Sequence, residues 1–277
     1  MGRRIKLDDG KKARLGEGVK LHTETSGNGP RILLCHGFGG SARNWRMQAR
    51  ALRGDFRVTL FDLRGHSRSP APPEPEAYTP QALLRDLDEL VRAEETPVIL
   101  GGLSLGAKLM LEYALEHREL VRALVLASYP SSGEVEKRRT WATGFANSIE
   151  ARGLDEAGAE FVWGERSRFD PKGAALIRQG LLEHSPFALA QILRQVLAPS
   201  PSPRSMSEQL RRLTIPTCVI AGSDDTESLL PCQDLAELLP NCELHVLEAA
   251  GHVVNLTKPA EFDRVLASFL APFRAPA

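Results

Sequence analysis

The sequence predicts an α/β protein whose mostly parallel sheet is covered by helices on both faces. Apolar runs alternate with amphipathic runs through the first 130 residues, and the same alternation resumes near residue 213. Alternation of this kind favours a parallel sheet, because each helix returns the chain to the same sheet edge. Residues 131–212 show helical patterns and no clear strand. We therefore expect one core, 1–130 with 213–277, interrupted by a helical insertion over 131–212.

The individual elements follow from local patterns. The expected strands are short apolar runs bounded by glycine, proline or polar residues. They cover 19–25, 32–35, 58–61, 98–100, 123–127, 217–221 and 243–247. The expected helices carry apolar residues at helical spacing. They cover 41–52, 80–94, 104–116, 227–239 and 259–270 in the core, and 134–152, 155–163, 171–184 and 186–197 in the insertion. The Pro/Ser stretch 198–203 is typical of a connector.

The composition restricts the classes of partner. The chain has 277 residues, 42% hydrophobic and 25% charged, which is ordinary for a globular protein. Its net charge is zero, so nothing favours bulk attraction to nucleic acid or to an anionic membrane. The basic N-terminus is not followed by an apolar signal-like segment, and no apolar stretch approaches the length of a membrane span. We therefore expect a cytoplasmic protein that binds a small-molecule substrate; the oligomeric state is left open.

The cysteines indicate no metal or redox chemistry. They stand at positions 35, 218, 232 and 242, with no C-x-x-C spacing, so the sequence indicates neither a zinc site nor a dithiol motif. Cys35 and Cys218 lie in strand-like apolar runs and are expected to be buried. Cys232 and Cys242 would pair only if the fold brought them together, which is uncommon in a cytosolic protein.

The most specific chemical motif surrounds Ser104. Gly102, Ser104 and Gly106 form a G-x-S-x-G pattern between an apolar run and a helix-forming run. A serine at a sharp turn between strand and helix is the layout of a nucleophile elbow, which points the hydroxyl out of the sheet. The alternative is a serine that merely caps the helix. A base and an acid further along the chain would favour the nucleophile over the helix cap.

A general base is expected at His252. This histidine follows the last predicted strand and precedes the last helix, at the sheet edge where Ser104 is expected. An imidazole with a pKa of about 6.5 takes a serine proton and returns it to a leaving group near neutral pH.

The acid that orients His252 is expected in the loop after the preceding strand. Asp224 and Asp225 stand side by side there. We favour Asp225, with Asp224 as the alternative, and either carboxylate could instead cap the following helix. The chain order Ser104, Asp225, His252 is the order expected for an elbow in this architecture.

Two backbone amides are predicted to hold a developing oxyanion. The N–H of Leu105 directly follows the serine. The second donor is assigned to Phe38 in the glycine-rich stretch 36–40, which brings the backbone close to a substrate. His36 is predicted to brace this loop rather than act as a second base. Asp62 and Arg64 are predicted to fix loops beneath the site rather than to react.

Taken together, these motifs resemble the α/β-hydrolase superfamily over nearly the whole chain. The resemblance rests on 36–39, 62–69, the Ser104 elbow, 222–225 and 251–252. It implies the α/β-hydrolase fold, a mostly parallel eight-stranded sheet flanked by helices, with 131–212 as a helical lid. It also implies an acid three residues after Gly222, which supports Asp225, and oxyanion amides at Phe38 and Leu105.

The choice within the superfamily depends on fewer residues. Haloalkane dehalogenases and epoxide hydrolases of this fold use aspartate at the elbow, so Ser104 disfavours both. The stretch 101–106 is similar to 3-oxoadipate enol-lactonases and small carboxylesterases. Lys108, however, stands where the menaquinone-pathway lyase that makes SHCHC has an arginine. The basic cluster 137–139 and the Phe161, Trp163 pair are also loosely similar to that lyase.

Four residues are expected to contact the substrate. Lys108 lies one helical turn after Ser104 on roughly the same helix face, where it would either meet a substrate carboxylate or be solvated. The insertion holds a large share of the aromatic residues, most of which are expected in its own core. Trp141, Phe161 and Trp163 are expected to line an apolar pocket.

Three functions remain open after this reasoning. The leading one is a serine hydrolase that cleaves a small carboxylic ester or lactone through an acyl-enzyme, without metal or organic cofactor. The second is a C–C or C–O lyase that acts on a carboxylated metabolite, uses the same triad as a base and requires Lys108 with the basic cluster 137–139. The third is a ligand receptor that keeps the triad but turns over little.

Overall fold

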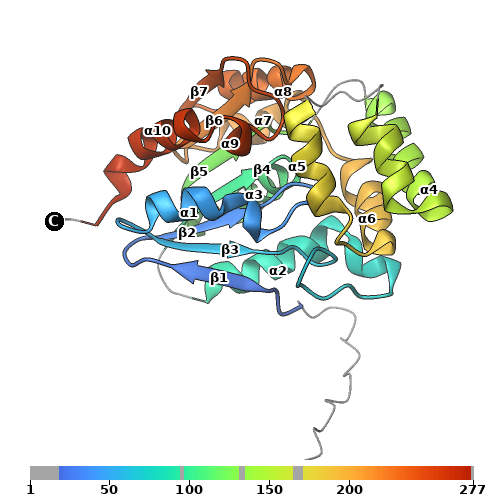
Figure 1. Cartoon of the computed structure of the whole chain (residues 1–277). Coiled ribbons are helices and arrows are strands. Elements are labelled where there is room, and N and C mark those ends of the chain that lie inside the picture. The colour runs from blue at the N-terminus through green and yellow to red at the C-terminus, as the bar shows by residue number, and fades with distance from the viewer. Residues whose placement is uncertain (1–18, 94–96, 131–134, 165–170, 276–277) are drawn as a thin grey trace, which may run out of the picture.

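The computed structural model describes residues 19–93, 97–130, 135–164 and 171–275. Their strands form one sheet in the order β1-β3-β2-β4-β5-β6-β7, in which β1 alone is antiparallel to its neighbour. The strands are β1 Thr23–Ser26, β2 Arg31–Cys35, β3 Arg57–Phe61, β4 Val98–Leu103, β5 Val121–Ala127, β6 Thr217–Gly222 and β7 Cys242–Leu247. The expected α/β architecture is confirmed, with helices on both faces of a mostly parallel sheet (Figure 1).

The sheet differs from the expected one in strand number. The described residues hold seven strands rather than eight, and these seven correspond to the seven apolar runs of the sequence. The eighth strand was implied by the family resemblance alone, with no apolar run to support it. β1 begins at Thr23 rather than at residue 19. Val19 and Leu21 are buried ahead of that strand, so their hydrophobicity reflects core packing outside the sheet.

The core lies on both faces of the sheet, because the central strands β2, β4 and β6 are buried at every position. One face packs against helices α2, α3 and α8, and the other against α1, α9 and α10. These helices are α1 Arg46–Leu52, α2 Pro80–Arg92, α3 Leu105–Glu116, α8 Thr226–Leu238, α9 Val254–Thr257 and α10 Pro259–Leu270. Short 3-10 turns cover Ala42–Trp45, Pro75–Tyr78, Arg118–Leu120, Pro203–Met206 and Ala271–Phe273. Parallel strands place the loops after β2, β4, β6 and β7 at one edge, where the candidate site residues lie.

The described part of the segment between β5 and β6 contains helices and connecting turns but no strand. Its helices are α4 Val135–Gly158, α5 Pro171–Leu181, α6 Pro186–Ile192 and α7 Ser207–Arg211, with π-helical turns at Ala159–Trp163 and Leu193–Leu197. Gly153, with φ of 82°, kinks the long α4 helix. In Figure 1, α4, α5 and α6 lie together at the side of the molecule toward which the parallel strands point. The division at 131 and 212 stays a prediction, and residues 131–134 lie outside the described residues.

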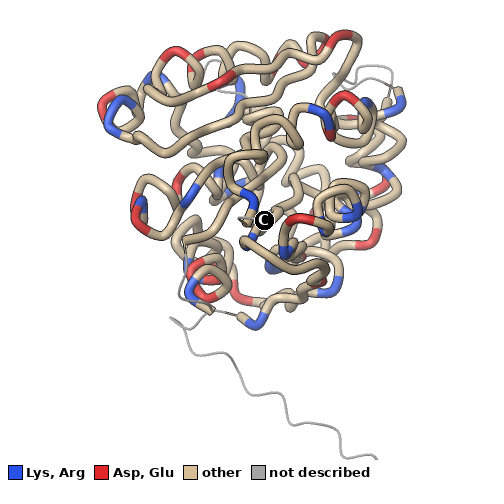
Figure 2. Tube along the Cα trace, turned by 90° about the vertical axis from the view of Figure 1, so that its left-hand side faces the viewer, with Lys and Arg blue, Asp and Glu red and all other residues tan. Residues whose placement is uncertain are grey.

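Charged residues are interspersed over the trace. In the view of Figure 2, basic and acidic residues alternate over the helices and loops without a face of one sign. The absence of net charge in the sequence therefore comes from local mixing of charges. None of the helices among the described residues is both long and apolar enough to span a bilayer.

Candidate active site

Ser104 occupies a strained turn between β4 and α3. Its φ of 53° and ψ of −114° are unusual for a residue with a side chain, and its N–H donates to the Ala127 carbonyl at 2.9 Å. The flanking glycines make this turn possible. A Cβ on Gly102 would lie 2.3 Å from the Gly106 carbonyl carbon, and one on Gly106 would lie 2.4 Å from the Cys35 oxygen. The G-x-S-x-G spacing therefore follows from close packing of strand against helix.

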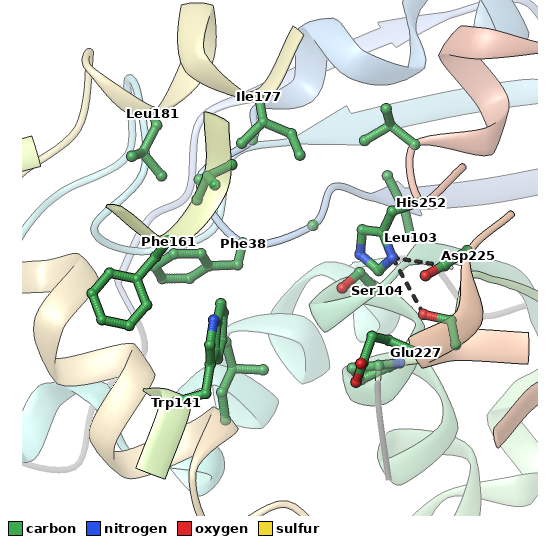
Figure 3. A pocket seen from close by; sticks show the side chains of 18 of the residues that line it. Phe38, Leu103, Ser104, Trp141, Phe161, Ile177, Leu181, Asp225, Glu227 and His252 are labelled. Atoms are coloured by element: carbon green, nitrogen blue, oxygen red, sulfur yellow. Dashed lines mark hydrogen bonds and ion pairs between the residues drawn. The ribbon is translucent and has the colours of Figure 1, made fainter. Parts of the chain in front are cut away.

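His252 and Asp225 are hydrogen-bonded to each other beside this turn (Figure 3). The His252 Nδ1–H donates to Asp225 Oδ2 at 2.8 Å, and the Asp225 side chain is only 6% exposed. The neighbouring carboxylate, Asp224, instead accepts a hydrogen bond from Ser223 Oγ at 2.8 Å. Of the two candidate acids, the structure therefore pairs Asp225 with the imidazole, and Ser104 lies by the same ring in Figure 3.

The electrostatic environment keeps Asp225 ionised. Burial raises the pKa of its carboxyl, but the charge of His252 and hydrogen bonds from His252 and Ser228 outweigh this effect, so the pKa lies below its ordinary value. A depressed pKa in the folded state means that the carboxylate stabilises the fold at neutral pH. That contribution is lost as the pH falls through the folded-state pKa.

The sequence analysis missed Ser228, which belongs to the first turn of α8. Its side chain is completely buried, and its Oγ lies 3.2 Å from His252 Nδ1. The hydroxyl also donates to the Asp225 carboxylate. Ser228 therefore braces both the acid and the base. Its only sequence signal is its place three residues after Asp225, in a helix start where serine is common.

We expect Ser228→Ala to lower kcat about tenfold while KM stays within about twofold, because one hydrogen bond to the buried Asp225 carboxylate is lost. The pKa of Asp225 should rise toward its ordinary value, so acid unfolding should begin at a higher pH than in the wild type. Steady-state kinetics and a circular-dichroism pH titration measure both effects. Ser223→Ala is the matched control, since Ser223 bonds to Asp224. Unchanged kcat and an unchanged acid midpoint in Ser228→Ala would contradict the bracing role.

The predicted oxyanion amides belong to Leu105, directly after Ser104, and to Phe38, in the loop after β2. Leu105 is the first residue of α3, so its N–H has no carbonyl partner one turn earlier within the helix. Phe38 follows β2 and lines the same cavity as Ser104. In the turns, loops and helix caps of the described residues, no backbone hydrogen bond uses the N–H of Phe38 or of Leu105. Both amides are therefore available to an incoming oxygen.

Buried histidines hold the Phe38 loop in place. His36 Nε2 accepts from the Leu63 N–H at 3.0 Å, and its Nδ1–H donates to the Gly37 carbonyl at 2.8 Å. Burial lowers the pKa of His36 to about 4, so the ring is neutral at pH 7. His66 Nε2 accepts from the Gly39 N–H at 3.2 Å. His36 thus braces the loop as expected, and His66 adds a second brace.

Asp62 and Arg64 also take the bracing positions expected of them. Asp62 Oδ1 accepts from the Ala42 N–H at 2.6 Å and Oδ2 from the Arg68 guanidinium at 3.0 Å. Arg64 forms a buried ion pair with Asp86, and its Nη1 donates to the Ala77 carbonyl at 2.7 Å.

The inserted helices touch the same loop. Gly39, with φ of 67°, packs so closely against α5 that a Cβ there would lie 2.4 Å from Leu181 Cδ1. His184, just after α5, accepts at Nδ1 from the Ser67 N–H at 2.8 Å. The insertion is thus fixed to the core beside the candidate oxyanion amides.

A cavity of about 590 Å³ connects these residues with the insertion. Ser104, Asp225 and His252 lie at one side of it in Figure 3, and Phe38, Trp141 and Phe161 at the other. Phe145 stacks on Phe161 with ring centroids 4.9 Å apart and joins this aromatic wall. Further lining residues that the sequence analysis did not single out are Leu103, Leu176, Ile177, Leu181, Glu227 and Leu230. A mostly apolar cavity with a few polar groups suits a small organic ligand.

Two of the expected substrate-binding residues lie elsewhere. The Lys108 side chain is 2% exposed, does not line the cavity, and donates to both carboxylate oxygens of Glu112 at 2.6 and 2.7 Å. The shared-face argument fails because Ser104 precedes the helix and has non-helical backbone angles. Trp163 ends a π-helical turn, packs against Gly158 and lies under the Arg178 guanidinium, 5.3 Å from the ring centroid. It is absent from the cavity lining.

Comparison with known proteins identifies the family. A sequence profile of the alpha/beta hydrolase family matches residues 32–265. The chain is 31% identical over 270 residues to a putative carbamate hydrolase RutD of Pseudomonas savastanoi pv. phaseolicola, covering 91% of this chain and 97% of that protein. It is 26% identical to a putative 2-succinyl-6-hydroxy-2,4-cyclohexadiene-1-carboxylate synthase of Bacillus subtilis, covering 92% and 96%.

A solved structure agrees with this assignment. The thermophilic esterase of Thermogutta terrifontis superposes with a TM-score of 0.80 at 25% identity, covering 93% of this chain and 95% of that one. The profile match covers most of β2 and all of β3 to β7, with the Ser104 turn and the loops that carry Asp225 and His252. The chain therefore belongs to the alpha/beta hydrolase family.

Proposed function

We propose that this enzyme is a serine hydrolase that cleaves a carboxylic ester or lactone of a small molecule through an acyl-enzyme. One observation carries the proposal. Ser104, in its strained turn, opens into the same cavity as an imidazole held by a buried carboxylate at 2.8 Å. A hydroxyl, a base and an anion that orients the base are the parts that nucleophilic acyl transfer requires.

The reaction follows from these positions. As Ser104 Oγ attacks the substrate carbonyl, its proton passes to His252 Nε2. The carbonyl oxygen becomes an oxyanion and accepts hydrogen bonds from the N–H groups of Phe38 and Leu105. Collapse of this intermediate breaks the bond to the alcohol, which takes the proton from His252. Water then attacks the acyl-enzyme with His252 as base, and the carboxylic acid leaves. Asp225 stays ionised and stabilises the imidazolium.

The relatives support acyl transfer as the reaction class. One is named an esterase and another a putative carbamate hydrolase. Ester and carbamate cleavage both pass through attack on a carbonyl and an oxyanion. The apolar cavity wall favours substrates with an aliphatic or aromatic group, and its volume limits them to small molecules.

A substrate panel tests the proposal. We expect measurable turnover of short p-nitrophenyl esters and of lactones, with kcat/KM rising from acetyl to butyryl because the added methylenes contact the apolar wall. A burst of p-nitrophenol equal to the enzyme concentration would report the acyl-enzyme. Aryl carbamates in the same panel, which release the same phenol, compare transfer of a carbamoyl group with transfer of an acyl group. Absence of turnover and of a burst on every ester and lactone would refute the hydrolase proposal.

A second function, a lyase for a carboxylated metabolite, is favoured by one observation. Lys137 and Arg138 line the cavity, and the Bacillus subtilis relative is named as a synthase of a cyclohexadiene carboxylate. The lyase hypothesis expects Lys108 and the basic cluster 137–139 to bind a substrate carboxylate. Of these residues, Lys137 and Arg138 line the cavity and Lys108 does not. Consumption of a carboxylated cyclohexadiene precursor without incorporation of ¹⁸O from labelled water would favour this function over hydrolysis.

A further inference from the structure

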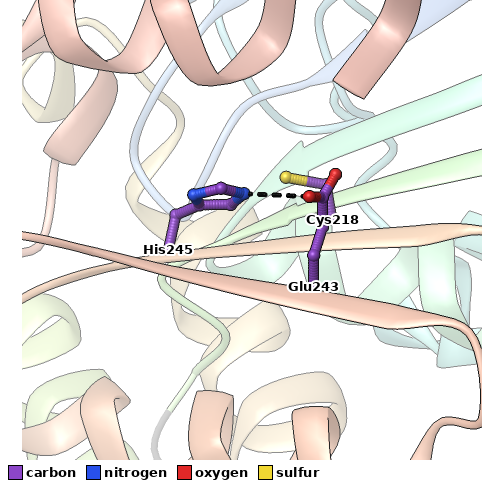
Figure 4. Close-up of side chains that lie close together, drawn as sticks. All are labelled: Cys218, Glu243 and His245. Carbon is purple, nitrogen blue, oxygen red and sulfur yellow. Dashed lines mark ion pairs between the residues drawn. The ribbon is translucent and has the colours of Figure 1, made fainter. Parts of the chain in front are cut away.

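A group of possible metal ligands lies on the sheet away from the cavity. Cys218 of β6 is paired in register with Glu243 of β7, and His245 follows two residues later on the same face of the strand. One ligand atom from each residue lies within 4.8 Å of the other two. Figure 4 shows the sulfur beside the ion pair of the two β7 side chains.

The dimensions of the group match tetrahedral zinc. Zinc–nitrogen and zinc–oxygen bonds of about 2.0–2.2 Å at a tetrahedral angle separate the two ligand atoms by about 3.4 Å. The observed distance from His245 Nε2 to Glu243 Oε2 is 3.3 Å. The sulfur lies within 4.8 Å of both atoms. A zinc–sulfur bond of about 2.3 Å in the same tetrahedron places the sulfur about 3.6 Å from each of them, so binding requires the ligand atoms to move closer by about 1 Å or less.

Charge and access also suit a divalent ion. A thiolate and a carboxylate together neutralise Zn²⁺, so the occupied site carries no net charge where β6 is buried. Cys218 itself is completely buried, whereas the side chains of His245 and Glu243 are 34% and 48% exposed. The ion can therefore enter from the solvent side of β7, the edge strand, and keep one water as its fourth ligand.

We propose that Cys218, Glu243 and His245 form a zinc-binding site that joins β6 to the edge strand β7. The sulfur, nitrogen and oxygen donors select zinc over magnesium or calcium, which prefer oxygen ligands alone. Cys218 stands four residues before the end of β6, about 13 Å along the strand from the loop that carries Asp225. The ion therefore stabilises the sheet edge and takes no part in acyl transfer.

Cobalt substitution tests the site in the full-length, untagged chain. We expect one equivalent of Co²⁺ to give sulfur-to-cobalt charge-transfer absorption in the near ultraviolet and d–d bands of tetrahedral intensity, and Zn²⁺ to abolish both. Cys218→Ser should remove the charge-transfer absorption. His245→Ala and Glu243→Gln should each weaken Zn²⁺ binding at least about tenfold, as measured by competition with a chromogenic chelator. Wild-type Tm should rise with Zn²⁺.

The matched control is Cys242→Ser. Cys242 precedes Glu243 and so points to the opposite face of the sheet, and its thiol is free. This variant should bind Co²⁺ as the wild type does. Loss of the cobalt spectrum in Cys242→Ser, its persistence in Cys218→Ser, or its absence from the wild type would each overturn the proposal. The two β7 variants change exposed side chains, so a folding defect in Cys218→Ser leaves them as an independent test.

Discussion

Replacing Ser104 with alanine is expected to lower kcat on a p-nitrophenyl ester by at least about 10⁴-fold, because the variant lacks the hydroxyl that forms the proposed acyl-enzyme. Alanine differs from serine by one oxygen and tolerates the same backbone, so KM and thermal stability should change little. Initial rates with the burst amplitude measure the effect. A fluorophosphonate probe should label the wild type at Ser104 and leave the variant unlabelled.

Ser67→Ala is the control for this experiment. Ser67 also has a positive φ, 45°, in a tight turn, but it does not line the cavity. Its activity and probe labelling should match those of the wild type. If Ser104→Ala retained the burst, or the probe labelled another residue, Ser104 would not be the nucleophile and the acyl-enzyme pathway would fail.

The adjacent aspartates provide the second large effect. Asp225→Asn is expected to lower kcat about 10⁴-fold, because a neutral amide neither stabilises the imidazolium nor holds the tautomer with its proton on Nδ1. Asp224→Asn should stay within about twofold of the wild type, because Asp224 bonds to Ser223 and not to His252. The two variants remove the same charge from neighbouring positions, so their difference isolates the contact with His252.

Comparison of kcat across the two variants at pH 7 and pH 9 checks the reason for the loss. Asp225→Asn should stay well below Asp224→Asn at both pH values, because raising the pH restores neither the tautomer nor the missing anion. Equal losses in both variants would mean that bulk charge matters rather than the 2.8 Å contact.

The parts of the site that the sequence predicted well are those fixed by backbone geometry. The glycines around Ser104 are required by packing of β4 against α3, so their spacing already determines a turn with an exposed hydroxyl. The positions of Asp225 and His252 follow from parallel strands, whose carboxyl ends lie at one edge of the sheet. Both predictions could be made without information about side-chain contacts between segments that are far apart in the sequence.

The parts that failed depend on side-chain direction and on packing between distant segments. Lys108 was placed by helical periodicity, which does not apply to Ser104 outside the helix. Trp163 was expected in the pocket because aromatic residues gather in the insertion, but its ring packs against Gly158 and under Arg178 instead. Cys218 and His245 come from two strands paired across the sheet, so no short sequence spacing marks them as a group.

The contact between Gly39 and Leu181 restricts how this enzyme can be redesigned. A helical insertion taken from another family member would bring its own residue to position 181, against the loop whose Phe38 amide is one of the two proposed oxyanion donors. A larger residue there would displace that amide, and a smaller one would leave the loop unsupported. We therefore expect changes in the insertion to alter substrate range and turnover together, and libraries that vary the insertion should vary positions 39 and 181 as one unit.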